Sequence, residues 1–266
     1  MKKTHENLPK ISVITPTLNQ GNFIEKTIKS VLDQKYPNLE YIVMDGGSTD
    51  NTLKVLNKFK DKLKFFSGKD KGQSDAINKG IISSTGDIIC FVNSDDYLLE
   101  GSLKKVADFF LKNSNAFWLT GKCYVVDEKN KEVRKLITLY KNLFLKYLRI
   151  KKIFSVVQFI SQPSTFWRRE VFDKVGPFDI RLNYDMDYDY WLRIWKKYPL
   201  YYMDEYLSSY RVHKNSKAVV SPSTQFEVQY QIIKKYERNK FILFLHYLHA
   251  KFSLFIYKKF LTKKQI

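Results

Sequence analysis

The stretch GDIICFVNSDD, from Gly86 to Asp96, places two adjacent carboxylates directly after a run of apolar residues. The apolar part, Ile88 to Val92, is typical of a strand that is buried on both faces of a parallel sheet. Two neighbouring aspartates repel each other, and the end of a strand holds them rigidly in place. Asp95 and Asp96 therefore either form a solvated turn that caps the following helix or bind a cation.

The residues before this stretch alternate between apolar runs and amphipathic helical patterns. Strands are expected within residues 11–19, 39–50, 63–72 and 86–92, and helices within residues 21–34, 51–63 and 73–84. Because parallel strands need a long crossover connection, which is usually a helix, this order predicts an α/β fold. We expect a mostly parallel central sheet with helices on both faces.

The regular alternation stops after residue 98. The elements expected next are a helix within 102–113, a pair of strands within 116–127 and 131–140, a short helix before Gly176, a helix within 185–198, a strand within 200–213, and helices from Gln225 onward. We therefore divide the chain into one domain of residues 1–222 and a helical tail of residues 223–266.

The composition indicates a folded and strongly basic protein. Of the 266 residues, 44% are hydrophobic and 16% aromatic, which is enough to build a core. The formal net charge of +19 favours a polyanionic partner: nucleic acid, an anionic membrane surface or a phosphorylated small molecule. The two cysteines, Cys90 and Cys123, lie in apolar runs, and the N-terminal MKKTHENLPK lacks the apolar core of a signal peptide. We thus expect a cytoplasmic protein without a disulfide framework.

Three loops with unusual residues follow three of the expected strands: TPTLN (15–19), DGGSTD (45–50) and NSDD (93–96). In an open parallel sheet, such loops share one edge, at which ligands bind. Asp45 can accept a hydrogen bond from an N–H of a heterocyclic base, but Asp45, Ser48 and Asp50 can equally form the turn and the cap of the next helix. A divalent cation on a diphosphate needs only one or two protein carboxylates, which Asp95 could supply.

Five motifs follow one another in the order and spacing of a known family: TPTLN, DGGSTD, DKGQSDAINKG, GDIICFVNSDD and DYDYWLR. Over residues 10–215 the chain resembles the family 2 inverting glycosyltransferases, and in particular the bacterial branch that builds surface polysaccharides. The resemblance implies the GT-A nucleotide-sugar-binding fold, with residues 10–98 as the nucleotide-binding half and residues 99–222 as the acceptor half. It implies a hexosyltransferase that moves a sugar, with inversion, from a nucleotide diphosphate sugar, expected to be a UDP-sugar, to an acceptor hydroxyl.

The resemblance also implies roles for single residues. Asp45 would contact the nucleotide base, and Asp95 would hold Mg²⁺ or Mn²⁺ against the diphosphate. His213, at the end of a strand, would be a second metal ligand, although a structural histidine is equally compatible with its position. Asn93 stands where many relatives have an aspartate, and it is a weaker metal ligand. The expected donor-binding residues are Thr15, Pro16, Asn19, Asp45, Asp70, Lys71, Asp75, Asn93, Ser94 and Asp95.

The motif DYDYWLR resembles the helix that supplies the catalytic base of these enzymes, in which an acidic pair precedes an aromatic residue. Met186 replaces the first acid here, so the resemblance assigns the base to Asp187, with Asp185 and Asp189 as alternatives. On a helix, Asp185 and Asp189 share one face, and Asp187 points ~160° away from both. Taken without the resemblance, the three acids could simply form a solvated face.

The tail is basic and aromatic. From Gln231 onward it has nine lysines and arginines and a single acid, Glu237, around the stretch FILFLHYLHAKFSLFIYKKFL. A lysine and two histidines in the middle of this stretch argue against a membrane-spanning helix. They favour an interfacial helix among anionic headgroups, with packing on the domain or a homodimer as alternatives. The acid-free stretch of residues 133–169 is a second candidate surface.

Together these surfaces and the resemblance predict a saccharide or lipid-linked saccharide acceptor, and a protein that lies peripherally on the inner face of the cell membrane. One alternative is a basic nucleic-acid-binding module, but acids gather where a nucleic-acid groove would need cations. A sugar nucleotidyltransferase would more typically carry a Lys or Arg in its first loop, which TPTLNQGN lacks. The last alternative is a catalytically inactive relative that only binds a partner. We therefore expect no nucleic acid as a partner.

Overall fold

The computed structural model describes residues 8–261. Residues 1–7, which contain most of the stretch that lacks a signal-peptide core, and Lys263 and Lys264 of the basic tail lie outside the described residues. The chain forms two compact units, each assembled from three separate stretches of sequence. The first unit comprises residues 1–124, 161–181 and 198–210, and the second comprises residues 125–160, 182–197 and 211–266.

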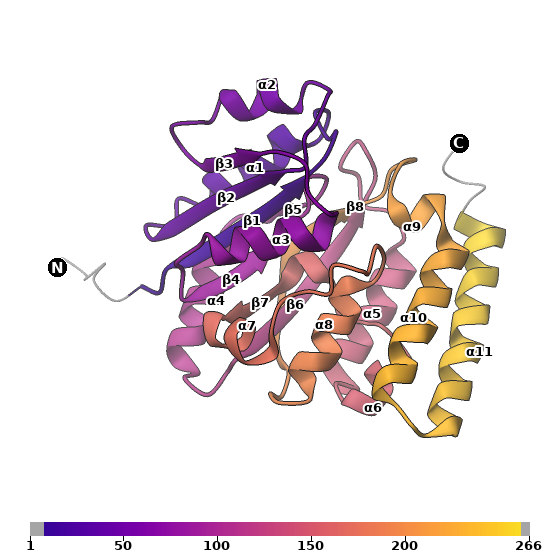
Figure 1. Ribbon diagram of the computed structural model, residues 1–266. Helices are drawn as coiled ribbons and strands as arrows, with labels where there is room; N and C mark the ends of the chain where they lie inside the picture. The colour runs from indigo at the N-terminus through magenta and orange to yellow at the C-terminus, as the bar shows by residue number, and fades with distance from the viewer. Residues whose placement is uncertain (1–7, 262–266) are drawn as a thin grey trace. The chain divides into compact units, whose positions relative to one another are not determined.

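The first unit is built on an eight-stranded sheet with the strand order β3-β2-β1-β4-β7-β6-β8-β5 (Figure 1). Its parallel strands are β3 (Lys64–Ser67), β2 (Leu39–Asp45), β1 (Ile11–Thr17) and β4 (Ile88–Phe91). The other strands are β7 (Thr165–Arg168), β6 (Trp118–Val126), β8 (Tyr201–Arg211) and β5 (Tyr97–Leu98). The pairs β4–β7, β7–β6 and β8–β5 are antiparallel. The predicted α/β fold is confirmed, and the four strands expected before residue 98 are the four parallel ones.

Helices cover both faces of the parallel strands (Figure 1). The helices of this unit are α1 (Ile24–Leu32), α2 (Thr52–Asn57), α3 (Gln73–Ile82), α4 (Ser102–Lys112) and α7 (Arg169–Val175), together with the 3-10 turn η1 (Gln162–Ser164). Val13 of β1 belongs to one apolar cluster with Ile28 of α1 and Val106 of α4. Its neighbour Ile14 lies on the other face, against Gly80 of α3. Because side chains alternate between two covered faces, these strands require the unbroken apolar runs found in the sequence.

The second unit is helical. Its elements are α5 (Lys135–Tyr147), α6 (Lys151–Phe154), α8 (Met186–Trp195), α9 (Lys217–Val220), α10 (Pro222–Tyr236), α11 (Lys240–Ile256) and the π-helical turn η2 (Tyr257–Leu261). The helix α10 packs against both α8 and α11, and α10 and α11 lie side by side (Figure 1). Within residues 8–261, no helix combines the length and the apolarity that crossing a membrane requires.

One prediction about the second half differs from the structure. Residues 131–140 were expected to form a strand, but only Glu132 makes a β-bridge, and α5 begins directly after Arg134, whose φ is 55°. The apolar residues of this stretch recur at helical spacing, as Leu136 and Leu139 do, so the alternating pattern was misread. The domain boundary at residue 222 stays a prediction; within the second unit, residues 182–197 are grouped with the helices of the predicted tail.

Gly86, the first residue of GDIICFVNSDD, permits a close approach between β1 and the start of β4. The N–H of Gly86 donates to Ser12 Oγ at 2.9 Å. A Cβ atom at this position would lie 2.6 Å from the backbone nitrogen of Ser12, which cannot rotate away as a side chain could. A side chain at residue 86 would therefore push β1 and the start of β4 apart.

We expect Gly86→Ala to lower the free energy of unfolding by about 1–3 kcal/mol, the usual cost of overpacking a filled site. Urea denaturation followed by circular dichroism measures this loss. Gly68→Ala is the matched control, because an added Cβ there meets no atom within 4 Å. Equal stabilities of the two variants would contradict the close approach of the strands at Gly86.

Candidate active site

Asp45 ends β2 within a buried hydrogen-bond network. The residue is 3% exposed. Its Oδ2 accepts from Ser67 Oγ of β3 at 2.6 Å, and its Oδ1 accepts from Ser48 Oγ at 2.5 Å. The N–H of Ser48 also donates to Oδ2 at 3.1 Å. The interpretation of Asp45 and Ser48 as turn residues is therefore confirmed, and the carboxylate holds the DGGSTD loop against the end of β3.

The ends of β2 and β3 and the start of α3 surround a hollow of about 190 Å³. Its lining residues include Asp45, Asp70, Ser67 and Phe66, together with Lys69 and Lys79. A Cβ at Gly46 would lie 2.7 Å from Asp70 Oδ2, so a larger residue there would require the Asp70 side chain to shift. An apolar ring face beside several hydrogen-bond acceptors suits a planar heterocycle that carries N–H donors.

The loop before α3 is organised by its own carboxylates. Asp70 Oδ1 accepts from the N–H of Gly72 at 2.7 Å. Asp75 Oδ2 accepts from the N–H of Lys71 at 2.9 Å and pairs with Lys79 Nζ at 2.8 Å. The hydrogen bond from Lys79, and then that from the Lys71 backbone, lower the pKa of Asp75. Asp75 therefore shapes the loop, whereas the side chain of Lys71 is exposed.

The predicted contacts from β1 are not all available. Pro16 is buried inside the strand, and the buried hydroxyl of Thr15 is paired with Tyr41 OH at 3.1 Å. Asn19 lies beyond the strand with φ 53°, and its Oδ1 accepts from the N–H of Thr49 at 2.8 Å, which joins the TPTLN and DGGSTD loops. The side chains of Thr15 and Pro16 thus support the site from inside the sheet.

Thr17 was not among the predicted residues. It is the last residue of β1 and lies opposite Asp45 in the strand register. It is 5% exposed, and among residues 8–261 its buried Oγ1 has no hydrogen-bond partner. Because a buried hydroxyl without a partner costs free energy, this atom is a candidate for a ligand contact. The signal in the sequence was its position as the final strand residue before the loop.

The two adjacent aspartates have different environments. Asp96 is fully buried, and its Oδ2 accepts from Asn93 Nδ2 at 3.3 Å while its N–H donates to the carbonyl of Asn93 at 3.0 Å. The carbonyl of Asp96 accepts from Thr27 Oγ1 of α1 at 2.6 Å. Asp95, in contrast, is partly exposed. Asp96 thus belongs to the turn, and Asp95 is the carboxylate that a cation could reach.

Asn93 ties the end of β4 to two other elements. Its Oδ1 accepts from Gln73 Nε2 of α3 at 2.7 Å, and its Nδ2 donates to Gln162 Oε1 of η1 at 3.2 Å. Gln162 Nε2 in turn donates to the carbonyl of Phe91 at 2.6 Å. Ser94, the next residue, is buried. Gln73 and Gln162 were not predicted as site residues, because only the fold brings them to Asn93.

The first unit does not offer a cation a complete cage of protein ligands. Within the described part of the chain, no three His, Cys, Asp or Glu side chains are grouped so as to hold a metal ion. Asp95 is one partly exposed carboxylate at a strand end, which fits a hard cation that takes its other ligands from phosphate oxygens and water. His213 belongs to the second unit and is buried there. Its backbone N–H donates to Ser216 Oγ at 2.9 Å.

In the second unit, the three candidate bases lie at the start of α8: Asp187 and Asp189 in its first turn, and Asp185 directly before it. Asp189 is 3% exposed, and both of its oxygens have partners: Arg193 Nε at 2.9 Å and Tyr236 OH of α10 at 2.5 Å. Asp185 precedes the helix with φ 52°, and its Oδ1 accepts from Gln229 Nε2 of α10 at 2.7 Å. Asp185 and Asp189 therefore both accept hydrogen bonds from α10, although Asp185 lies before the helix and not on it.

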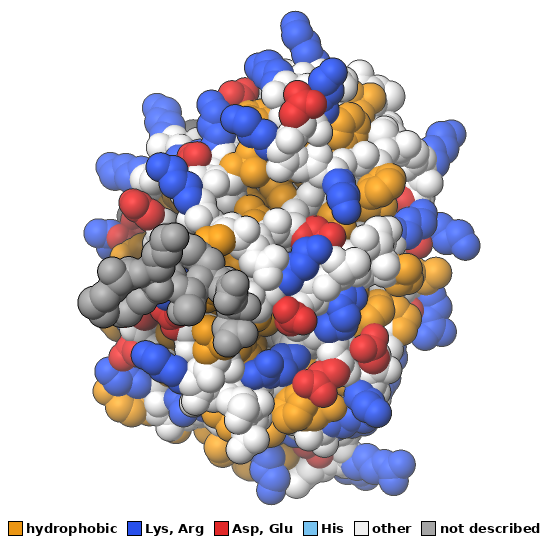
Figure 2. Space-filling view, turned by 90° about the vertical axis from the view of Figure 1, so that its left-hand side faces the viewer, with side chains coloured by type: hydrophobic (Ala, Val, Ile, Leu, Met, Phe, Trp, Pro, Cys, Tyr) orange, Lys and Arg blue, Asp and Glu red, His pale blue; other side chains and the backbone are white. Residues whose placement is uncertain are grey.

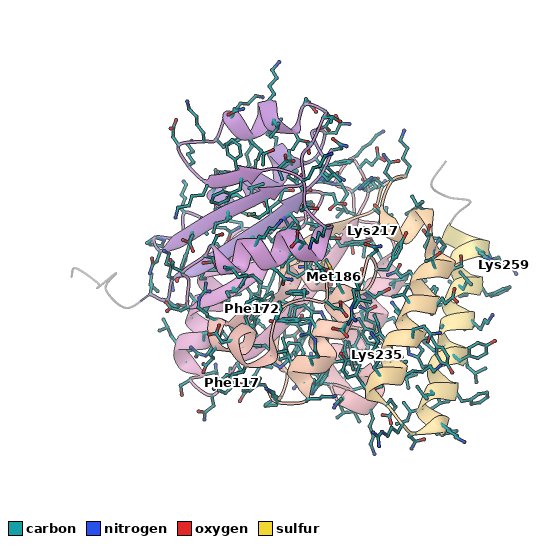
Figure 3. The ribbon with its side chains drawn as sticks, in the orientation of Figure 1. Phe117, Phe172, Met186, Lys217, Lys235 and Lys259 are labelled. Atoms are coloured by element: carbon teal, nitrogen blue, oxygen red, sulfur yellow. The ribbon has the colours of Figure 1, made fainter. Side chains whose placement is uncertain are left out.

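Asp185 and Asp187 differ in what surrounds them. Burial and the charge of Asp187 raise the pKa of Asp185 to about 7, although Gln229 and Gln225 oppose the shift. Among the described residues, Asp185 Oδ2 is buried without a hydrogen-bond partner. The side chain of Asp187 is partly exposed. The burial of its carboxyl group raises its pKa, whereas the N–H of Tyr188 and the charges of Lys141 and Lys217 lower it. Figure 3 labels Met186 and Lys217 at the starts of α8 and α9.

Several known glycosyltransferases resemble this chain. The protein is 28% identical over 268 residues to the putative teichuronic acid biosynthesis glycosyltransferase TuaG of Bacillus subtilis, covering 97% of this chain and 98% of that one. It is 34% identical over 128 residues to the GalNAc(5)-diNAcBac-PP-undecaprenol beta-1,3-glucosyltransferase of Campylobacter jejuni, covering 46% and 41% of the two chains. It spans only 44% of a Haemophilus influenzae glycosyltransferase and 34% of one from Rickettsia conorii.

Solved structures share the fold. A TarS fragment of S. aureus in complex with UDP-GlcNAc matches with a TM-score of 0.66 and 22% identity, over 84% of this chain and 65% of that one. The mannosyltransferase PcManGT of Pyrobaculum calidifontis, in complex with GDP-Man and Mn²⁺, matches with a TM-score of 0.68 and 17% identity, over 95% and 76%. The sequence model described as Glycosyl transferase family 2 matches residues 12–176, which contain the sheet edge described above. The chain therefore belongs to glycosyl transferase family 2.

Proposed function

We propose that the protein is an inverting hexosyltransferase that moves a sugar from a nucleotide diphosphate sugar to an acceptor hydroxyl in the synthesis of a cell-surface polysaccharide. The observation that carries the proposal is the gathering of acidic and amide side chains at the carboxyl edge of the parallel strands, in a chain of this family. The similarity to TuaG along almost the whole of both chains supports the assignment to surface polysaccharides.

The donor would bind at this edge of the first unit. We propose that the donor is a UDP-sugar, with its base beside Asp45, Ser67 and Asp70. The UDP-GlcNAc complex of the TarS fragment supports this choice of donor. Thr17 Oγ1 would gain its missing hydrogen bond from the nucleotide, whereas Thr15, Pro16, Asn93 and Ser94 would act by holding the loops in place.

Mg²⁺ or Mn²⁺ would be held by Asp95, with His213 as the proposed second ligand. When bound, such a cation would neutralise the negative charge that develops on the departing diphosphate. The Mn²⁺ in the complex of PcManGT with GDP-Man supports a divalent cation here. Because Asp95 supplies a single carboxylate, it would hold the cation only when the diphosphate of the donor supplies further ligand oxygens.

Transfer would occur by a single displacement. Asp187, as the carboxylate, removes the proton from the acceptor hydroxyl while that oxygen attacks the anomeric carbon. The bond from this carbon to the diphosphate oxygen breaks on the opposite side, so the anomeric configuration inverts and the nucleoside diphosphate leaves. Asp187 is favoured over Asp189, whose oxygens are bound by Arg193 and Tyr236. It is favoured over Asp185 because it is the more exposed carboxylate.

The acceptor would be a saccharide or a lipid-linked saccharide at an anionic membrane surface, with the protein on the inner face of the cell membrane. The undecaprenol-linked substrate named for the Campylobacter relative supports a lipid carrier. Nucleic acid is not a proposed partner. On the face in Figure 2, lysines and arginines are interspersed with acids and apolar side chains instead of forming the continuous stripe that nucleic acid requires.

Asp187→Asn should lower kcat at least about a hundredfold, because the amide cannot accept the acceptor proton. The release of nucleoside diphosphate from a panel of UDP-sugars measures turnover, and calorimetry should find donor binding changed by less than about twofold. Asp61→Asn, an exposed acid after α2, is the control and should turn over like the wild type. Turnover that persists in Asp187→Asn would remove this residue from the role of base.

Removal of divalent cations with EDTA should abolish transfer, and Mn²⁺ should restore it. Asp95→Asn should raise the Mn²⁺ concentration for half-maximal activity at least about tenfold, since one ligand oxygen is lost. A Mn²⁺ titration of the activity measures this shift, again with Asp61→Asn as the control. Full activity in EDTA would contradict the metal assignment for the whole site.

The titration of Asp185 should make stability fall with rising pH. A carboxyl group whose pKa is raised on folding contributes stability below its unfolded pKa, and this contribution is lost as the pH rises through about 7. Between pH 5 and pH 8 the wild type should lose about 2 kcal/mol more than Asp185→Asn, which cannot ionise. Urea denaturation at both pH values measures the difference. Parallel pH profiles of the two proteins would show that Asp185 does not titrate in this range.

A further inference from the structure

The helix α11 has an apolar outer face. Ile242, His246 and Ala250 point inward, and His246 Nδ1 lies 2.8 Å from the carbonyl of Ser155, which fixes the orientation of the helix. The opposite face exposes a stripe of large apolar side chains: Phe241, Phe244, Tyr247, Leu248, Phe252 and Phe255. A helix with a packed inner face normally turns polar residues outward, so this outer stripe is not explained by the folding of the unit.

The helix α5 continues this apolar surface. Leu136, Leu139, Leu143 and Tyr147 are exposed along one of its sides, and Leu136 is 82% exposed. Tyr140 OH of α5 lies 3.1 Å from His249 Nε2 of α11, and the two rings are stacked. The stripes of α5 and α11 are therefore neighbours within the second unit and form one surface, which we call the α5–α11 surface.

The two stretches of sequence that form this surface carry charges of one sign. Residues 133–160 and 238–261 contain no Asp or Glu. Their exposed cations include Lys146, Arg149, Lys152, Arg238, Lys240, Lys251, Lys258 and Lys259, and also Lys135, whose Nζ lies 3.6 Å from Glu132 Oε2 at the edge of the first stretch. Lys251 Nζ lies 5.3 Å from the ring centre of Tyr247, and Lys259 Nζ lies 5.4 Å from that of Phe255. Figure 3 shows Lys259 at the C-terminal end of the helix. The ammonium groups of these lysines thus lie next to aromatic rings of the α11 region.

We propose that the α5–α11 surface docks on an anionic lipid bilayer, with the aromatic and leucine side chains entering the boundary between headgroups and acyl chains. An acid-free apolar stripe bordered by lysines is complementary to that boundary, because the apolar side chains leave water while the ammonium groups meet lipid phosphates. The inference rests on the proposed function only in that a lipid-linked acceptor requires a membrane.

Two other occupants fit less well. A second copy of this chain would bring lysines against lysines, because neither stretch has an acid to pair with them. A nucleic acid would use the cations but would leave exposed leucines such as Leu136 and Leu143 in water, since they cannot stack on bases. The bilayer is the partner that uses both the charges and the apolar stripe.

The test is co-sedimentation of the full chain with vesicles of equal parts phosphatidylcholine and phosphatidylglycerol at low salt. The wild type should pellet with these vesicles, and should bind vesicles of phosphatidylcholine alone at least about tenfold more weakly. The double variant Phe244→Glu/Phe252→Glu should bind the anionic vesicles at least about tenfold more weakly than the wild type. Leu136→Glu should weaken binding on its own, because α5 belongs to the same surface.

The matched control is Ile82→Glu/Leu111→Glu, which places the same charges at exposed apolar residues of the first unit and should bind like the wild type. A thermal shift with UDP and Mn²⁺ reports the donor site separately. If that shift is present and the wild type stays in the supernatant, the docking proposal fails while the proposed function stands. A dimer in light scattering that Phe244→Glu/Phe252→Glu dissociates, or equal binding by all variants, would also overturn the α5–α11 surface as a lipid site.

Discussion

The parallel pairing of β1 with β2 and β4 is the constraint on which the first unit depends. The register aligns Thr17 with Asp45, and the N–H of Val92 donates to the carbonyl of Ile14 at 2.9 Å, so three strands end at one edge. A slip by one residue would move every side chain to the other face of the sheet, where it does not fit the packing. At the opposite ends of the same strands, Glu40 opposes such a slip.

The buried carboxylate of Glu40 joins all three strands. Its Oε2 accepts from Ser12 Oγ of β1 at 2.6 Å and from the N–H of Thr85, just before β4, at 2.7 Å. Although burial by itself raises the pKa of Glu40, these hydrogen bonds and Lys10 lower it overall, so the group remains ionised and accepts from both neighbours. The site at one edge of the sheet is thus aligned by a polar contact at the other.

The sequence predicted most of what depends on local pattern. The parallel strands were recognisable because burial on both faces demands continuous apolar runs, and Asp45 because it ends one of them. The sequence did not predict which side chains long-range contacts would bury or bond. Nothing local separates Asp95 from Asp96, yet the fold buries one and leaves the other partly exposed. Likewise, only the packing of α10 shows that Asp189 has partners for both oxygens, while one oxygen of Asp185 has no partner within residues 8–261.

The position of α10 limits where the chain can be truncated. Gln225 and Gln229 donate to Asp185, and Tyr236 donates to Asp189, so this helix supplies the polar groups that two buried carboxylates of α8 require. A chain that ended at residue 222 would retain each recognisable motif and lose those donors. The motifs therefore end before the donors of α10, and an expression fragment has to extend beyond Tyr236 to keep these hydrogen bonds to the start of α8.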